Sequence, residues 1–389
     1  MPVKNRIGEW QQELTGWRHD LHRHPELRFE EHRTAAFVAE RLREMGCDLV
    51  REGVGKTGVV AVIRGRQEGS GRVVAFRADM DALPILERTG AAHASTVEGR
   101  MHACGHDGHT TMLLGAMRYL AETRNFDGTV VALFQPAEEG GGGAKAMLAD
   151  GVFEEFGVQE VYGLHNWPGV PVGQFRTRPG PFLAANDKFE IVVTGKGGHG
   201  AMPHLATDAN LAAAQIVMAL QSVVSRAIDP QHPAVVTVGG MRSDSYAYNV
   251  LPDAVRMLGT IRFYHAEDEA LIRRRMQEIV TACAAAQGCS GELIFHGGVA
   301  ALVNADENAR LAADVAEAVS GQVVRDTAPV MGSEDFGDML TARPGAFLFL
   351  GNGEDSADLH NPEYDFNDAL IPVGASFFAQ MAETRMPVK

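Results

Sequence analysis

The chain has 389 residues, of which 45% are hydrophobic and 22% are charged, and its formal net charge is -15 at pH 7. This acidic balance argues against nucleic acid as a partner, because nucleic-acid binding needs a basic surface, and it also disfavours an anionic membrane surface. The length exceeds that of one ordinary domain, so we expect two domains.

The first half of the chain alternates predicted helices with predicted strands. Apolar residues recur at helical spacing over residues 31–46, and Gly46 is a typical helix end. β-Branched runs predict strands at 57–65 and 72–80, and the second strand ends on Asp79 and Asp81. The further predicted elements are a helix at 109–124, a strand within 128–143, a helix at 143–151 and a strand at 161–166. This alternation predicts an α/β domain with a mostly parallel sheet and flanking helices.

The pattern changes near residue 187. Residues 188–204 predict a strand with alternating polarity that glycines interrupt. The predicted elements that follow are a helix at 208–227, strands at 234–243 and 254–264, and a helix at 267–288. The apolar face of the last helix comprises Ile272, Met276, Ile279, Cys283 and Ala286. We therefore expect an α+β domain at 187–298, inserted into an α/β domain of residues 1–186 and 299–389. The α/β pattern resumes with a helix at 307–319, a strand at 345–353 and a last helix.

Metal-capable side chains follow predicted strands at four places. In open α/β sheets, sites form beyond the carboxyl ends of the strands, so these side chains are expected at one edge of the sheet. A lone histidine is more often a surface or core residue, but four such segments together favour a metal site. The residues are Cys104, His106, Glu138, Glu139, His165 and His360.

The donor types suit two divalent ions. Thiolate and imidazole favour zinc, whereas imidazole and carboxylate also accept manganese. Five protein ligands exceed the needs of one tetrahedral ion and suit two ions roughly 3.5–4 Å apart, with the thiolate of Cys104 as a bridge. Of the two adjacent glutamates, one would bind metal and the other would act as a base. For both to face the site the backbone must leave strand geometry, and Pro136 and the glycine run after the glutamates supply that break.

With these residues assembled, the chain resembles the hippurate hydrolase and auxin-conjugate hydrolase branch of the metallopeptidase clan that includes aminoacylases and glutamate carboxypeptidases. The resemblance rests on "HPEL", "FRADMDALPI", "MHACGHDGHT", "QPAEEGGGGA", "LHN", "GGHGAMPH", "NVLPD", "GSEDF" and "LHNPEYDF", which run from residue 24 to residue 366. It implies a catalytic domain and an inserted lid domain through which homodimers form, with tetramers as a further possibility.

The resemblance also implies the roles of the site residues. Glu138 is the expected general base, Asp79 is a supporting carboxylate, and the expected metal ligands are Cys104, His106, Glu139, His165 and His360. The implied reaction is hydrolysis of an N-acyl amino acid, in which Glu138 takes a proton from water and returns it to the leaving amine. In the two-zinc peptidases of the clan a histidine and a bridging aspartate stand where this chain has Arg77 and Cys104. That departure matches this branch and leaves the identity of the metal open.

Three further residues are expected to contact the substrate. Asn249 and Arg262 are thirteen residues apart, as in the clan's carboxylate-binding pair, and the alternative is an ordinary surface salt bridge. His199 is expected to act in the active site of the partner subunit, as the matching histidine does in relatives. The alternative for His199 is a structural role in the lid turn, and His204 is a nearby competitor.

Two rival functions stay open at this stage. One is a dipeptidase or carboxypeptidase of the same clan, against which Arg77 counts. The other is a catalytically silent dimer that binds a small ligand. No apolar leader or membrane-spanning run is visible, and four sparse cysteines without paired spacing fit the reducing cytoplasm, so we expect a cytoplasmic protein that binds neither membranes nor nucleic acid.

Overall fold

A computed structural model describes residues 4–389 and divides the chain into two units. The inserted unit begins four residues before the predicted position 187 and ends four residues after the predicted position 298, and a short later segment returns to it. The larger unit comprises residues up to 182, 303–328 and 335–389, and the smaller unit comprises residues 183–302 and 329–334. Residues 1–3 of the predicted first domain lie outside the described part of the chain.

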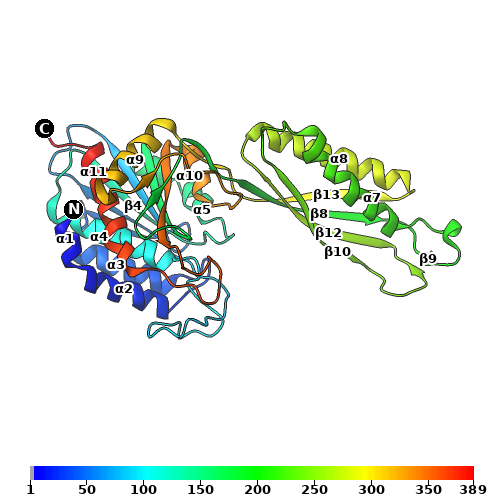
Figure 1. Cartoon of the computed structure of the whole chain (residues 1–389), viewed down its shortest axis with the longest axis horizontal. Coiled ribbons are helices and arrows are strands. Elements are labelled where there is room, and N and C mark those ends of the chain that lie inside the picture. Colours follow the sequence, from blue (N-terminus) through cyan, green and yellow to red (C-terminus); the bar gives the residue numbers. More distant parts are fainter. Residues whose placement is uncertain (1–3) are drawn as a thin grey trace. The chain divides into compact units, whose positions relative to one another are not determined.

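An eight-stranded sheet forms the centre of the larger unit (Figure 1). The strand order is β1-β2-β4-β3-β5-β16-β6-β15. The four central strands β4, β3, β5 and β16 are parallel to one another. The pairs β1–β2, β2–β4 and β16–β6 are antiparallel. The predicted α/β fold with a mostly parallel sheet is confirmed. The strands are β1 (Leu49–Val54), β2 (Gly58–Arg64), β3 (Val73–Asp79), β4 (Thr129–Gln135), β5 (Glu160–Pro168), β6 (Phe175–Arg176), β15 (Val323–Val324) and β16 (Gly345–Gly353).

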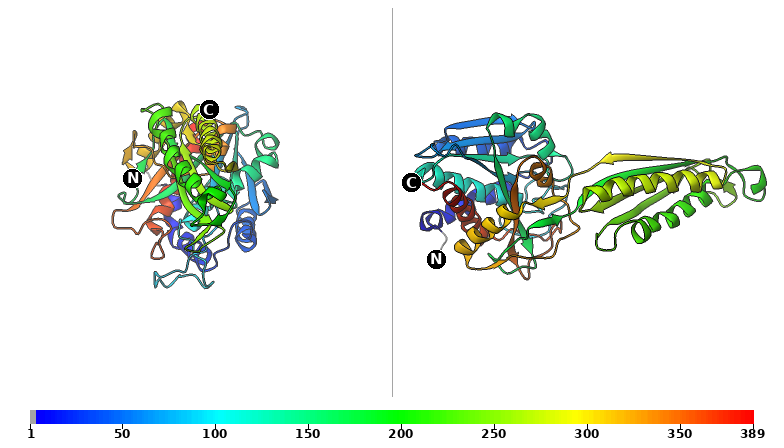
Figure 2. Two further views of the ribbon diagram at one scale, coloured as in Figure 1. Left: turned by 90° about the vertical axis from the view of Figure 1, so that its right-hand side faces the viewer. Right: turned by 90° about the horizontal axis from the view of Figure 1, so that it is seen from above.

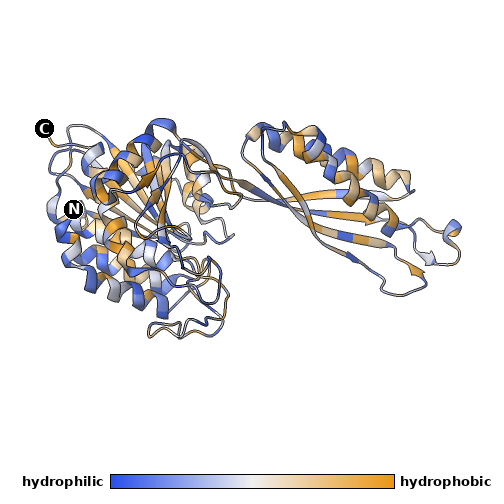
Figure 3. Ribbon diagram, in the orientation of Figure 1, coloured by the Kyte–Doolittle hydropathy of each residue, from blue (hydrophilic) through white to orange (hydrophobic). Residues whose placement is uncertain are grey.

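Both faces of this sheet are buried. Alternate residues of β3, Val74, Phe76 and Ala78, join the main hydrophobic core, whereas Ala75 and Arg77 point to the opposite face and are also buried. Burial on both faces explains why the strands are almost continuously apolar rather than alternating. Figure 3 shows the hydrophobic strands at the centre of this unit and hydrophilic outer faces on its helices.

Helices cover the sheet on its two faces. The helices α4, α9 and α11 contribute residues to the core that Phe76 joins, and α5 and α10 pack against each other elsewhere. The helices of this unit are α1 (Asn5–Glu9), α2 (Gln11–Arg23), α3 (His32–Glu44), α4 (His106–Thr123), α5 (Gly143–Ala149), α6 (Val152–Glu155), α9 (Asp306–Ser320), α10 (Phe336–Ala342), the 3-10 helix Asp368–Leu370 and α11 (Ile371–Arg385). No helix in the described part of the chain has the length and apolarity needed to span a bilayer.

The smaller unit is a four-stranded antiparallel sheet with two long helices on one face. Its strand order is β10-β12-β8-β13, and α7 and α8 lie side by side on the sheet (Figures 1 and 2). Side chains of β8 alternate between buried and more exposed, as expected for a sheet covered on one face. The elements are β8 (Ala185–Thr194), β9 (Gly198–His199), the 3-10 helix Pro203–Leu205, α7 (Ala209–Ser222), a π-helical turn at Val223–Ala227, β10 (Val235–Ser243), β11 (Val250–Leu251), β12 (Ala254–Phe263), α8 (Ala266–Ala286) and β13 (Ser290–Gly297).

Two short strands pair where the chain passes between the units. They are β7 (Gly180–Leu183) and β14 (Leu302–Asn304). Within the larger unit, the parallel strands β3, β4, β5 and β16 all direct their carboxyl ends to one edge of the sheet. The predicted ligand segments follow or end these strands, so this edge is where a site should form.

Candidate metal centre

The five predicted ligands form one continuous cluster in the larger unit. The Sγ atom of Cys104 lies 3.4 Å from Nε2 of His165, and Nε2 of His360 lies 3.0 Å from Oε1 of Glu139. Ligand atoms of Cys104, His106 and Glu139 all lie within 4.8 Å of one another. Segments that are up to 256 residues apart in the sequence (104 to 360) therefore place five metal-capable groups together.

The loop before α4 brings Cys104 and His106 to the cluster. Gly105 between them has φ of +88°, which favours glycine. A Cβ atom at this position would lie 2.2 Å from Oδ1 of Asn166 and 2.6 Å from the hydroxyl of Tyr364. Glycine is therefore required both by the backbone turn and by the space available.

His106 and His165 each use Nδ1 for a contact within the protein, which leaves Nε2 for a metal. Nδ1 of His106 lies 3.2 Å from Asp81, and Nδ1 of His165 donates to the carbonyl oxygen of Asn166 at 2.7 Å. Nε2 of His106 is buried and has no hydrogen-bond partner among the described residues. A metal-binding histidine typically donates its other ring N–H to a carboxylate or a carbonyl in this way.

The two glutamates follow a sharp backbone turn. Strand β4 ends at Gln135, and Ala137 has φ of +52°, so the break from strand geometry that we predicted at this position is confirmed. Asp81 then accepts hydrogen bonds from the backbone N–H groups of Glu138 at 3.1 Å and Glu139 at 2.9 Å. This anchoring role of Asp81 was not predicted.

The electrostatics of the cluster suit a bound cation. Burial raises the pKa of the Cys104 thiol well above its usual range, and the negative charges of Glu139 and Glu138 raise it further. Burial and the charge of His109 hold the pKa of His165 well below its usual range, so this imidazole is neutral, as a ligand must be. A bound cation is the group that makes a buried thiolate favourable beside two carboxylates.

Asp79 and His109 support the cluster. Oδ1 of Asp79 lies 2.6 Å from Nδ1 of His109, and Oδ2 accepts a hydrogen bond from Arg77 at 2.7 Å. Nε2 of His109 lies 2.6 Å from Oδ1 of Asn166. Since both oxygens of Asp79 and both ring nitrogens of His109 have partners, these residues are better suited to orienting the ligands than to binding metal.

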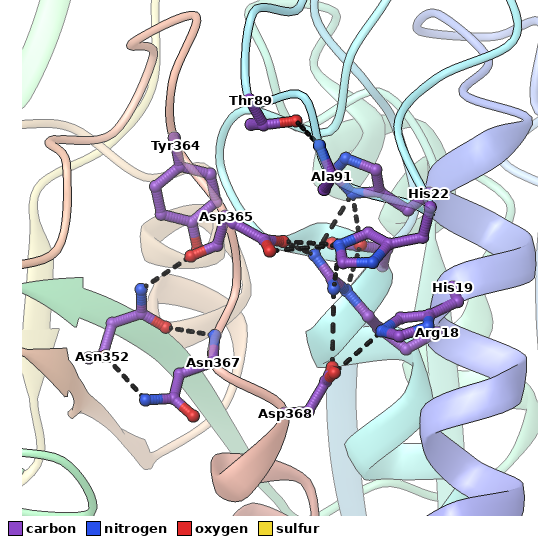
Figure 4. Close-up of polar contacts among 12 residues, drawn as sticks. Arg18, His19, His22, Thr89, Ala91, Asn352, Tyr364, Asp365, Asn367 and Asp368 are labelled. Atoms are coloured by element: carbon purple, nitrogen blue, oxygen red, sulfur yellow. Dashed lines mark hydrogen bonds and ion pairs between the residues drawn. The ribbon is translucent and has the colours of Figure 1, made fainter.

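A second buried network lies directly behind the cluster, at the start of α4. Asp107, the residue after His106, accepts a hydrogen bond from Arg18 at 2.8 Å and lies 2.8 Å from Nδ1 of His22. Arg18 also donates to Asp365 (Figure 4). Burial opposes the positive charge of His22, but Asp107 raises the pKa of this imidazole to about 9. The network ties α2 and the segment after β16 to α4, and so fixes the position of the ligand loop.

His102 differs from these histidines. It is buried, and neither ring nitrogen has a hydrogen-bond partner among the described residues. Burial lowers its pKa to about 4, so the ring is neutral. His22, His102 and His109 are all buried, whereas His24 is partly exposed.

In the smaller unit, Arg262 is half-buried and has no acidic partner among the described residues. Its guanidinium donates to Oγ of Ser333 at 2.7 Å, and Asn186 donates to the same oxygen at 2.6 Å. Partial burial lowers the pKa of Arg262. The alternative reading of Arg262 as a partner in a surface salt bridge is therefore not supported, and Ser333 is a contact that the sequence did not predict.

The structure does not bring Asn249 and Arg262 together within one chain. Arg262 pairs with Asn186 near the start of β8, whereas Ala254, nearer to Asn249 in sequence, pairs with Thr194 at the other end of that strand. At about 3.3 Å per residue, Ala254 and Arg262 lie roughly 26 Å apart. The predicted pair does not come together in one chain, because the twelve residues between its members run mostly along a single extended strand.

His199 lies beside Asn249 instead. His199 pairs with Val250, and the N–H of Gly200 donates to the carbonyl oxygen of Asn249 at 2.7 Å. His199 is exposed, and its Nδ1 accepts the N–H of Ala201 at 3.1 Å. The competitor His204 is also exposed and lies in the 3-10 helix that follows.

Comparison with known proteins identifies the family. Residues 75–384 match the model of peptidase family M20/M25/M40. The chain belongs to this family. The matched region includes every predicted metal ligand and both glutamates, so the cluster described above is part of the shared fold.

The similar M20/M25/M40 proteins include amide hydrolases. Hippurate hydrolase of Campylobacter jejuni is 41% identical over 97% of each chain, and N-acetyl-L-cysteine deacetylase of Bacillus subtilis is 39% identical over 97% of this chain and 88% of its own. A solved structure of a dinuclear metal-binding peptidase of the M20 family from Bacillus subtilis has a TM-score of 0.86 and 33% identity, and covers 97% of this chain and 99% of its own. The resemblance to the hippurate and auxin-conjugate hydrolase branch is thus confirmed.

The donor set of this M20/M25/M40 member fits two divalent metal ions. It offers one thiolate, imidazoles and a carboxylate. Nε2 of His106 has no hydrogen-bond partner among the described residues, and Oδ2 of Asp79 lies 3.6 Å from it. Five donors exceed what a single tetrahedral ion binds. Two nearby cations would also balance the negative charge of a buried thiolate.

Proposed function

We propose that this chain hydrolyses the amide bond of N-acyl amino acids and releases a carboxylic acid and a free amino acid. The observation that carries this proposal is the cluster of Cys104, His106 and Glu139 with the adjacent Glu138 at the carboxyl edge of the sheet. The chain is a hydrolase that acts on amide bonds, as its family membership and its relatives indicate.

The metals would be held by the cluster side chains. Cys104 would bridge the two ions, and the other ligands would be His106, Glu139, His165 and His360. When bound, two divalent ions polarise the acyl carbonyl and lower the pKa of water. Zinc and manganese both suit this donor set, and we propose one or the other as the native metal.

Glu138 is the proposed general base. Its backbone N–H donates to Asp81, the next residue is a proposed ligand, and its negative charge raises the pKa of the Cys104 thiol, so we place its carboxylate near the cluster. It would accept a proton from the attacking water and return that proton to the leaving nitrogen. To take a proton from water beside the metals, the carboxylate of Glu138 must lie close to the metals without binding them.

Arg262 is the proposed contact for the substrate carboxylate. A half-buried guanidinium without an acidic partner favours an anion, and its planar fork can donate two parallel hydrogen bonds to a carboxylate. Ser333 holds the side chain in place by accepting from one nitrogen. A free α-carboxylate is the feature that separates N-acyl amino acids from neutral amides.

His199 and Asn249 are proposed to serve the partner subunit of a homodimer. They lie together at the end of the smaller unit's sheet that is remote from Arg262. A residue from the partner that donates to the developing oxyanion would be worth roughly 2.7–4 kcal/mol. We also propose a cytoplasmic location, because all four cysteines are free thiols.

A substrate panel tests the proposed function. Metal-loaded protein should release free amino acid from N-benzoyl, N-acetyl and indole-acetyl amino acids, and should cleave a dipeptide with a free amino terminus much more slowly. Amidation of the substrate carboxylate should lower kcat/KM sharply in the wild type and little in Arg262→Ala. Preference for the dipeptide would instead favour a peptidase, and an equal loss in both proteins would reject the role of Arg262.

A further inference from the structure

Glu31 is a fully buried carboxylate that neither the ligand set nor the proposed proton transfer uses. It immediately precedes α3 and has a relative exposure of 0%. Its Oε1 accepts the backbone N–H of Ala137 at 2.8 Å, and its Oε2 accepts the hydroxyl of Thr57 at 2.5 Å. Its described contacts include no cationic side chain. Burial of a carboxylate without a cation costs free energy, so this residue needs an explanation other than stability.

Ala137 is the residue at which the backbone turns toward the metal cluster. Its φ of +52° is unfavourable for alanine, and its side chain is fully buried. Ala137 immediately precedes Glu138. The hydrogen bond from its N–H to Glu31 is therefore a contact that can hold this strained conformation.

Further strain lies around the same contact. Phe29 has φ of +60° and Lys56 has φ of +82°, and Nζ of Lys56 lies 3.8 Å from the centre of the Phe29 ring. These two residues flank Glu31 and Thr57 in sequence. Of the five described non-glycine residues with positive φ, Ala137 bonds to Glu31, and Phe29 and Lys56 lie within two residues of Glu31 or Thr57 in the sequence. Such strain persists only where the surrounding structure fixes it.

Two buried carboxylates together anchor three successive backbone amides. Glu31 accepts from Ala137, and Asp81 accepts from Glu138 and Glu139. The direction in which each glutamate side chain leaves the backbone depends on these amides. We propose that Glu31 is a positioning residue that fixes the turn at Ala137 and so aims Glu138 at the reacting centre. This inference rests on the proposed function, since it concerns the turn that carries the proposed base.

Two conservative variants test this role. In Glu31→Gln the amide oxygen can still accept from Ala137, and the Thr57 hydroxyl can accept from the new NH₂ group, so kcat should stay within about threefold of wild type. In Glu31→Asp the charge remains but the side chain is one carbon shorter and cannot reach both partners. We expect kcat to fall by about tenfold or more, with KM changed by less than about threefold. A displacement of a catalytic group by about 1 Å can lower the rate by about 100-fold.

Glu26→Asp is the matched control. The carboxylate of Glu26 accepts the backbone N–H groups of Arg33 and Thr34 at the start of the same helix, away from Ala137. This variant should lower the urea midpoint but leave kcat of the folded, metal-loaded protein unchanged. Wild-type kcat in Glu31→Asp, or a larger loss in Glu31→Gln than in Glu31→Asp, would overturn the inference. If the wild type itself hydrolyses no N-acyl amino acid, the proposed function fails, but the role of Glu31 can still be tested through metal content, because the turn also positions Glu139. Glu31→Asp should then bind less metal than Glu31→Gln. Equal metal binding by the two variants would overturn the inference.

Discussion

Glu138 and Glu139 are neighbours in the sequence but have different surroundings. Glu139 lies within 4.8 Å of the donor atoms of Cys104 and His106 and contacts His360 at 3.0 Å, whereas Glu138 is not part of that group. The turn at Ala137 and the two amide contacts to Asp81 allow both side chains to reach the same edge of the sheet. This difference is the physical basis for assigning one glutamate to a metal and the other to proton transfer.

Substitution of each glutamate by glutamine should separate these roles. Glu138→Gln should keep its metal but lose about 10²–10⁴-fold in kcat, since that is the usual contribution of general acid–base catalysis. Glu139→Gln should lose metal as well as activity. Metal content by elemental analysis, measured with kcat on the same samples, provides the check, and equal metal and equal activity in both variants would show that the assignment is wrong.

His22 should make stability depend on pH. Its pKa is about 9 in the folded protein because the charge of Asp107 outweighs the effect of burial, whereas an unfolded histidine titrates near 6.5. Since the folded-state pKa is the higher one, protonated His22 stabilises the fold. This contribution is fully present below about pH 6.5 and is lost as the pH rises through about 9.

Urea unfolding at pH 6.5 and pH 9.5 measures this contribution. We expect the wild type to lose on the order of 1–3 kcal/mol more across this range than His22→Gln, which lacks the titrating group. The exposed His204→Gln serves as a control and should behave as wild type does. A wild-type loss no larger than that of His22→Gln would remove His22 from the buried network as a charged partner.

Single residues of the site were predictable to different degrees. The ligands were found because Cys104, His165 and His360 follow or end strands, and parallel strands direct their carboxyl ends to one edge. The anchoring contacts of Asp81 were not predicted, because nothing in the sequence shows which backbone amides a distant carboxylate will accept. Glu31 was missed for the same reason, since it lies 106 positions from Ala137.

At the scale of single elements, the loop before α4 depends on one glycine. Gly105 has φ of +88°, and a side chain there would collide with Asn166 and Tyr364. Gly105→Ala should destabilise the protein by about 1–3 kcal/mol and weaken metal binding, because both flanking ligands move with the loop. Gly16→Ala is the control, since Gly16 lies within α2 with open space around it and should gain about 0.5–1 kcal/mol. Thermal unfolding measures the stability of both variants, and metal titration measures their metal affinity. Unchanged metal affinity in Gly105→Ala would contradict the expectation.

Helix α8 shows where a sequence pattern lost accuracy. The predicted apolar face repeats every 3.5 residues, but a straight helix has 3.6 residues per turn, so the face drifts by about 20° per heptad. Ile272, Met276 and Ile279 are buried as predicted, whereas Cys283 is only half-buried and Ala286 is exposed. Burial continues at Val280 and Ala284 instead. Cys283 therefore packs against the core of the smaller unit but is only partly buried, and Ala286 lies outside that core.

Strands without a strong apolar pattern were missed. β1 at Leu49–Val54 is mostly exposed, and β13 at Ser290–Gly297 has only partly buried side chains. Both lie at an edge of their sheet, where one side of the strand is unpaired and polar residues are tolerated. Central strands such as β3 were predicted because burial on both faces demands apolar residues.

For the whole molecule, the separation of Arg262 from Asn249 is the observation behind the proposed homodimer. Sequence spacing suggested one carboxylate-binding pair, but β12 extends between the two positions. A single chain therefore offers Arg262 at one end of the smaller unit's sheet and His199 with Asn249 at the other. Spacing along a chain cannot reveal this separation, because the same twelve intervening residues could have formed a hairpin.

Mixing two inactive variants tests action across subunits. If His199 serves the partner, a dimer of His199→Ala with Glu138→Ala has one site with both defects and one site with neither. About half of the sites in such mixed dimers should then be active. Absence of recovery, despite heterodimers demonstrated by native mass spectrometry, would place His199 in its own subunit's site or outside the reaction.

The most direct test of the metal centre is a titration of metal-free protein with zinc or manganese, followed by hydrolysis of an N-acyl amino acid. Activity should be absent without metal and should reach its maximum near two equivalents per subunit. Cys104→Ser should weaken binding of both ions, because Cys104 is the proposed ligand shared by the two ions. Undiminished hydrolysis by the metal-free protein, or full activity in Cys104→Ser with a single bound ion, would contradict a binuclear amide hydrolase.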